Sequence, residues 1–127
     1  MKKTLIFFIS LTLLLPFISG CAALLAGSAG AGTVAYIRGE LQANAEADLE
    51  KAVSASNKAI TNLQFIKVSE QTDKLASKII CRNAQDKKIT ITLKKITDNS
   101  TEVSIRVGMF GDQTLSLTLL DEINKEL

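Results

Sequence analysis

Residues 89–96 (ITITLKKI) and 102–109 (EVSIRVGM) place apolar and polar side chains in alternation. Because successive side chains of a β-strand point to opposite faces of a sheet, each run predicts a strand with one buried and one solvated face. Residues 65–70 and 76–82 show the same alternation. The connecting segments are polar and too short for crossovers between parallel strands. The four runs therefore predict a four-stranded antiparallel meander.

Amphipathic segments flank these runs on both sides. Apolar side chains recur every three or four residues from residue 41 or 44 to residue 63, which is the spacing of a helix. Asp112 is placed to cap a second helix that extends to Leu127. Two such helices can cover the apolar face of the sheet. We therefore predict an α+β fold, a two-layer sandwich in the order α-β-β-β-β-α with both helices on one face of the sheet.

The beginning of the chain has a different character. Lys2 and Lys3 precede an uncharged apolar run at residues 4–17, which is typical of an export signal and short for a bilayer-spanning helix. The segment ISGC at residues 18–21 follows, and it resembles the lipobox of bacterial lipoproteins. This resemblance implies that the chain is cut before Cys21 and that the Cys21 thiol receives a diacylglycerol.

This interpretation divides the chain into a signal peptide (residues 1–20), a lipidated N-terminus with a small-residue tether (21–40) and an α+β domain (41–127). Ala22 stands where inner-membrane lipoproteins of enteric bacteria carry Asp. The resemblance thus implies anchoring to the outer membrane, facing the periplasm, with the inner membrane as the alternative. Residues 4–37 are uncharged, so an uncleaved spanning helix is a further alternative. The Gly and Pro residues in that stretch favour bending over spanning.

The tether allows two interpretations. Residues 22–35 (AALLAGSAGAGTVA) are mostly Ala, Gly, Leu and Ser, and small residues recur at a spacing of four, as in Gly27 and Ala31. Such spacing permits close packing of helices in a membrane, so this stretch could self-associate in the leaflet. Alternatively, it is a flexible spacer that carries the domain off the lipid surface.

Three segments extend the resemblance beyond the lipobox. Residues 35–41 (AYIRGEL), 101–112 (TEVSIRVGMFGD) and 116–123 resemble a family of small bacterial lipoproteins classed as a domain of unknown function. The likeness covers nearly all of the chain after the export signal, and the IRVGMFGD segment is its most specific part. It implies the same lipid anchor, and it supplies no activity and no catalytic residue.

Composition argues against several classes of function. The two N-terminal lysines account for the whole net charge of +2, so the chain after the export signal is neutral. A nucleic-acid footprint needs an excess of Lys and Arg, and we therefore expect no nucleic-acid partner. The sequence has no His, which removes His-based catalysis and nearly all zinc sites. We expect no enzyme, no cofactor and no metal, because acids such as Asp98, Glu102 and Asp112 suit turns and caps.

Cys81 has no partner if Cys21 is lipidated. We interpret it as a small buried apolar residue, and the alternative is a reactive or pairing thiol.

Four residues are candidates for an interaction site. Tyr36 and Arg38 lie where the tether meets the domain, where Tyr suits a membrane interface and Arg can reach lipid headgroups. Arg106 and Phe110 accompany the turn at residues 108–112, whose backbone amides ahead of a helix can hold an anion or a headgroup. The simpler alternative is structural, with a contact to the tether and a capped strand-to-helix turn.

Together these patterns predict a membrane-anchored envelope lipoprotein whose domain is a non-catalytic binding or structural module. Its expected partners are the membrane, through the lipid anchor, and an envelope protein. The alternative is a small-molecule or lipid-binding carrier in the periplasm, which needs a cavity between the sheet and the helices.

Overall fold

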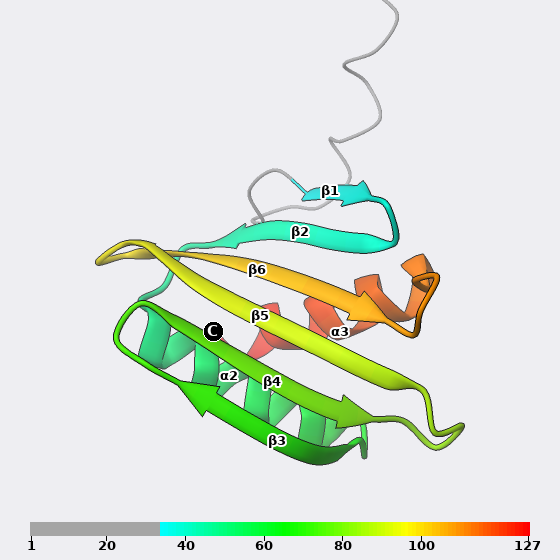
Figure 1. Cartoon of the computed structure of the whole chain (residues 1–127). Coiled ribbons are helices and arrows are strands. Elements are labelled where there is room, and N and C mark those ends of the chain that lie inside the picture. The colour runs from blue at the N-terminus through cyan, green and yellow to red at the C-terminus, as the bar shows by residue number, and fades with distance from the viewer. Residues whose placement is uncertain (1–33) are drawn as a thin grey trace, which may run out of the picture.

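The structure is a computed structural model, and it describes residues 34–127. Within these residues the chain forms six strands and two helices. In chain order they are β1 (Val34–Ile37), β2 (Glu40–Ala45), α2 (Leu49–Asn62), β3 (Ile66–Thr72), β4 (Ala76–Arg82), β5 (Lys88–Thr97), β6 (Ser100–Val107) and α3 (Gln113–Glu126). Figure 1 shows the strands as a single sheet with both helices behind it.

All neighbouring strands are antiparallel, and their order across the sheet is β1-β2-β6-β5-β4-β3. Strands β3 to β6 form a meander, in which each strand pairs with the next one along the chain. β2 precedes this meander in sequence but pairs with its last strand, so that Leu41 lies opposite Ile105 and Ala43 opposite Val103. β6 is therefore an interior strand, and β1 and β3 are the edges of the sheet.

The predicted four-stranded sandwich in the order α-β-β-β-β-α is wrong, because residues 34–45 add a hairpin of two strands. Residues 34–40, predicted to belong to the tether, form β1, a turn and the first residue of β2. The helix expected from residue 41 or 44 begins at Leu49. The fold is a mixed α+β arrangement built on a six-stranded sheet.

The sequence of β2 fits two periodicities, and this is the physical reason for the error. Leu41 and Ala45 are four residues apart, as on a helix, whereas Leu41, Ala43 and Ala45 also alternate, as on a strand. As a strand, β2 buries all three side chains. It also forms backbone hydrogen bonds with β6, and without β2 the strand β6 would be an open edge of the sheet. Arg38 and Gly39 both have positive φ, the geometry of a two-residue hairpin turn.

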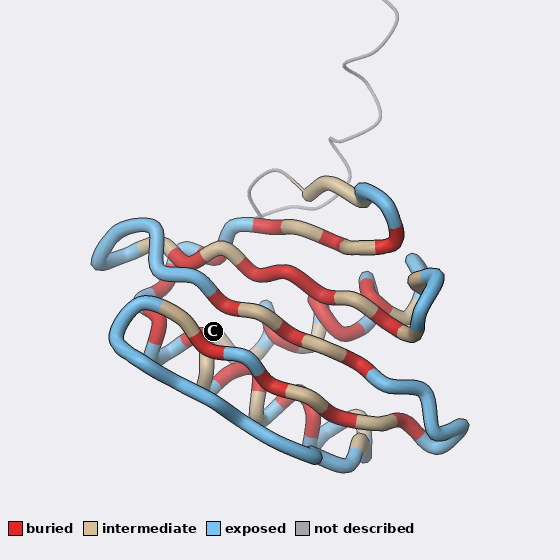
Figure 2. The backbone as a smooth tube through the Cα atoms, in the orientation of Figure 1, coloured by how far each residue is buried: buried red, intermediate tan, exposed pale blue. Residues whose placement is uncertain are grey.

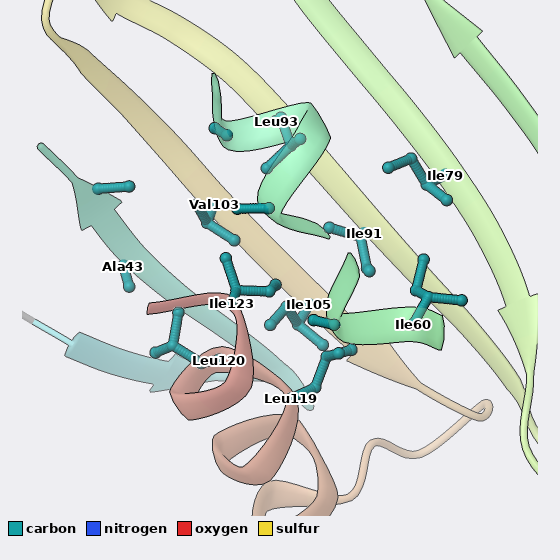
Figure 3. Packing of buried hydrophobic residues seen from close by; sticks show 14 of the residues in the cluster. Ala43, Ile60, Ile79, Ile91, Leu93, Val103, Ile105, Leu119, Leu120 and Ile123 are labelled. Carbon is teal, nitrogen blue, oxygen red and sulfur yellow. The ribbon is translucent and has the colours of Figure 1, made fainter. Parts of the chain in front are cut away.

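The core lies between the sheet and the two helices. Burial alternates along β4 and along the first six residues of β5, so these strands bury one face, and β6 buries the same face together with Ser104 on the other (Figure 2). α2 presents alanines to the strands, which lets the helix lie close to the sheet. Figure 3 shows aliphatic side chains of both layers meeting, among them Ile91, Ile105 and Leu119. The larger aliphatic side chains that are almost fully buried are Leu41, Ile79, Ile89, Ile91, Leu93, Val103, Ile105, Val107, Leu119 and Ile123.

Both helices begin at a capping aspartate. The Asp48 side chain accepts a hydrogen bond from the Lys51 backbone N–H at 2.7 Å, and Asp112 accepts one from the Leu115 N–H at 3.0 Å. These bonds satisfy amides that have no partner within a helix. The predicted cap at Asp112 is thus confirmed, and it sets the start of α3.

The predicted export signal, Cys21 and residues 22–33 of the predicted tether lie outside the described residues. Neither helix in residues 34–127 is long and apolar enough to cross a lipid bilayer. The lipid anchor thus stays a prediction from the sequence.

Candidate functional site

The structure brings the four predicted interaction residues to the same end of the sheet. Tyr36 is on β1, Arg38 is in the β1–β2 turn, Arg106 is near the end of β6, and Phe110 is in the β6–α3 loop. Figure 1 shows that this turn and this loop lie at the same end of the molecule. We call this surface the tip, and define it as residues 37–39 together with residues 108–112.

Two glycines bring the backbones of the tip into contact. Gly39 has a φ of 82° and Gly111 a φ of 83°, a region that L side chains rarely adopt. A Cβ atom on Gly39 would lie 2.6 Å from the Phe110 carbonyl oxygen. A Cβ atom on Gly111 would collide with the Gly39 backbone and with the Tyr36 hydroxyl group. The β1–β2 turn packs so tightly against the β6–α3 loop that only glycine fits at either position.

Arg106 links the same two segments by polar contacts. Its guanidinium donates to the Arg38 carbonyl oxygen at 3.1 Å and to the Met109 carbonyl oxygen at 3.5 Å. Its Nε also lies 3.8 Å from a carboxylate oxygen of Glu40. The side chain therefore has partners within the protein, and its geometry is that of a clamp between the turn and the loop.

The predicted anion site at residues 108–112 is occupied by the protein itself. The Asp112 carboxylate sits at the N-terminus of α3, and Lys87 Nζ lies 3.5 Å from it. The hydrogen bond from the Leu115 backbone N–H and, to a smaller degree, Lys87 hold the pKa of Asp112 below its usual range. A bound anion there would meet a negative charge, so the capped-turn interpretation describes this segment.

The tip holds its backbone firmly but exposes apolar side chains. Phe110 is 90% exposed, Met109 82% and Ile37 52%. The alternation in residues 102–109 placed Met109 on the buried face of a strand, and that placement is wrong. β6 ends at Val107, and Gly108, with a φ of 67°, turns the chain so that Met109 faces solvent. Both Gly108 and Gly111 are visible in the sequence as breaks on either side of an apolar pair.

Basic residues lie beside these apolar side chains. Arg38 precedes Gly39 in the turn and is exposed. The Gly108 N–H donates to the Lys88 carbonyl oxygen at 2.7 Å, which places the exposed residue Lys88 next to the loop. The acids near the tip have basic partners, since Glu40 lies by Arg106 and Asp112 by Lys87.

Outside the tip, the described residues offer little chemistry. Cys81 is fully buried on β4, and burial raises the pKa of its thiol to about 11. A shallow groove beside the start of α3 opens to solvent and is lined by Leu63, Phe65 and Leu115 among others. Residues 34–127 contain no cluster of three or more acidic or Cys side chains that could hold a metal ion.

A family model described as "Protein of unknown function (DUF3568)" matches residues 2–126. The chain belongs to this family, which confirms the expected classification as a domain of unknown function. No curated protein matches the chain.

Proposed function

We propose that the chain is the precursor of a membrane-anchored envelope lipoprotein, and that its domain is a non-catalytic module that binds or braces another envelope component. The observation that carries this proposal is the order of the first 21 residues: two lysines, an uncharged apolar run and ISGC. Each element of an export signal followed by a lipobox is present and in sequence. Cys21 is the residue that would be acylated.

The physical role of such an anchor is strong retention at a membrane. Each buried CH2 group of an acyl chain adds about 0.8 kcal/mol of membrane affinity, and two chains suffice for stable attachment. Ala22 after Cys21 favours the periplasmic face of the outer membrane, with the inner membrane as the alternative. Under this proposal the domain works close to a lipid surface.

The tip supports a binding role for the domain. Its backbone is fixed by the Gly39–Gly111 contact and by the Arg106 clamp, while Met109 and Phe110 extend into solvent. A folded monomer gains nothing from exposing such side chains, and a rigid loop loses little conformational freedom when it binds. An exposed apolar pair on a fixed loop is therefore a natural contact surface.

The alternative function, a small-molecule or lipid carrier, finds less support. A carrier of this fold would hold its ligand between the sheet and the helices, where Ile91, Ile105 and Leu119 are packed and fully buried. The grooves beside the helix N-termini are shallow and open to solvent. No observation favours this function over a binding or bracing module.

Mass spectrometry and crosslinking test the two parts of the proposal separately. The chain extracted from membranes of an expressing bacterium should begin at Cys21 and carry the mass of an added diacylglycerol. An unmodified Cys21, or cleavage elsewhere, would contradict the anchor. A photoreactive residue in place of Phe110 in intact cells should yield an adduct with a lipid or protein of the envelope. Recovery of monomer alone, from cells in which the chain is anchored, would contradict the binding role.

A further inference from the structure

We propose that the tip is a second membrane contact, in which Met109, Phe110 and Ile37 enter the interfacial layer of the bilayer and Arg38 and Lys88 pair with anionic phospholipid headgroups. This inference rests on the proposed anchor, because the bilayer in question is the one that would hold Cys21. It names the component that the domain binds: a phospholipid surface that carries negative charge.

The apolar side chains of the tip are held in the exposed direction by the contacts beneath them. Gly39 and Gly111 meet backbone to backbone, and Arg106 holds the carbonyl oxygens of residues on both sides of that contact. The loop cannot fold its apolar side chains back without separating these groups. Met109 and Phe110 therefore stay 82% and 90% exposed in the absence of a partner, and a lipid interface would bury them.

The charged residues around Met109 and Phe110 leave two basic side chains without an acidic partner in residues 34–127. Glu40, Asp86 and Asp112 are acids at this end of the sheet, and each lies within 4 Å of a basic side chain. Arg38 and Lys88 form no ion pair within residues 34–127. Two basic side chains beside an exposed apolar loop are complementary to an anionic membrane surface. On such a surface, the attraction of basic residues to the headgroups strengthens the binding that insertion of apolar side chains provides.

The segment between Cys21 and the domain is long enough to let the tip reach the bilayer. Twelve residues, 22–33, separate Cys21 from Val34, and a chain of that length spans at most about 40 Å when fully extended. β1 runs from Val34 towards the tip and covers only about 13 Å. The tether is therefore long enough for the domain to turn its tip to the lipid surface. An anchor and a tip at separate points would then set the orientation of the domain.

The opposite end of the sheet provides an internal comparison. Leu75, in the β3–β4 turn, is 69% exposed, so it resembles Met109 and Phe110 in exposure. It follows Asp73, which accepts hydrogen bonds from the Leu75 and Ala76 backbone N–H groups, and Lys74, so that one acid and one base lie beside it. The β5–β6 turn, in which Asp98 pairs with Lys95 at 2.8 Å, lies at the same end of the sheet. Leu75 thus tests whether exposure alone brings a side chain to lipid.

The absence of Trp from the sequence allows a single fluorescent reporter at either position. Full chains with Phe110→Trp or Leu75→Trp would be extracted from membranes and reconstituted in vesicles of phosphatidylethanolamine and phosphatidylglycerol. Brominated phospholipids should quench the fluorescence of the Phe110→Trp chain several-fold more than that of the Leu75→Trp chain. Adding Arg38→Ala and Lys88→Ala to Phe110→Trp should reduce the quenching, with an unchanged circular dichroism spectrum as the control for folding.

Equal quenching at the two positions, or stronger quenching for Leu75→Trp, would overturn the inference. So would a photoreactive residue at position 110 that forms adducts with a protein and none with lipid. The failure of the anchor is distinguished by the mass of the same preparation. Acylated Cys21 with no quenching of the Phe110→Trp chain removes only the tip contact, whereas unmodified Cys21 removes the proposed function on which it rests.

Discussion

At the scale of single residues, Gly39 and Gly111 allow the β1–β2 turn and the β6–α3 loop of the tip to come into contact. Both have positive φ and both leave no room for a Cβ atom, whereas Gly108 has positive φ but open space around it. This contrast separates two physical effects within one loop. A side chain introduced at any of the three positions would bring the backbone strain of a left-handed residue, and at Gly39 and Gly111 alone it would also collide with neighbouring atoms.

Alanine substitutions should therefore have unequal effects. Gly108→Ala adds only left-handed strain and should lower the free energy of unfolding by roughly 1–2 kcal/mol. Gly111→Ala should lower it by clearly more, because the turn and the loop must also separate. Urea unfolding followed by circular dichroism measures both. Equal losses for the two variants would show that the backbone contact in the tip is absent.

Asp112 links stability to pH. Its pKa is lowered in the folded chain by the Leu115 N–H and by Lys87, so its contribution is present above the pKa of the unfolded state, 3.8, and is lost as pH falls through the lower folded value. Asn also caps helices but does not titrate in this range. Asp112→Asn should thus retain most of the stability at pH 7 and lose less than the original chain between pH 5 and pH 3. Thermal unfolding between pH 5 and pH 3 measures how steeply the stability of each chain falls with pH. The same steepness in Asp112→Asn and in the original chain would show that Asp112 does not link stability to pH.

Cys81 should be inert in the folded protein. The thiol is fully buried, and its pKa of about 11 leaves almost no thiolate at neutral pH. A maleimide reagent should modify Cys81 only after the chain is unfolded in urea. Rapid modification of the folded chain would contradict its place in the core and would favour the alternative of a reactive thiol.

At the scale of elements, strands β3 to β6 and α3 could be predicted from sequence, whereas β1 was assigned to the tether and β2 could not be told from a helix. Strands β3 to β6 alternate clearly, and Asp112 marks the start of α3. Leu41 and Ala45 fit a helix as well as a strand, and only pairing with β6 decides between them. The turn residues Arg38 and Gly39 were a local signal for a hairpin, but the strands on either side of them are only four and six residues long.

β3 shows how the sheet protects an open edge. Every residue of this strand is exposed, including Ile66 and Val68, as Figure 2 shows. The pairing with β4 shifts between Lys67 and Ser69, and Lys67 and Glu70 form an ion pair at 3.0 Å beside Asn57 of α2. A bulge and inward charges are features that discourage pairing with another sheet edge.

Removing those charges should promote association of the chain with itself. The double substitution Lys67→Val and Glu70→Val leaves an apolar edge strand, and light scattering should show larger species at the same protein concentration. Glu50→Val with Lys51→Val removes one acid and one base from the exposed surface of α2 and serves as the matched control. Equal association of the two double variants would mean that the edge charges have no protective role.

At the scale of the whole molecule, the first hairpin explains why the four candidate residues lie at one end of the sheet. Tyr36 and Arg38 were selected for their position near the tether, and Arg106 and Phe110 for their place at a turn. They meet because β2 inserts beside β6, a pairing that a four-stranded sheet does not contain. Met109 was missed because alternation alone carries a strand through Gly108, whose positive φ in fact ends it.

The proposed anchor and the proposed tip contact would together hold a small domain at a lipid surface in a set orientation. The tip depends on tertiary contacts that sequence periodicity does not report, whereas the anchor depends on a short linear segment that sequence alone reveals. For this reason the two parts of the account are tested by different observations, and the anchor is the part on which the other depends.

Metabolic labelling with radioactive palmitate in an expressing bacterium tests the central claim most directly, because the chain has only two cysteines. The account predicts that the original chain and Cys81→Ser both incorporate label, and that Cys21→Ser incorporates none and keeps the size of the precursor. Label that persists in Cys21→Ser, or its absence from the original chain, would contradict the account.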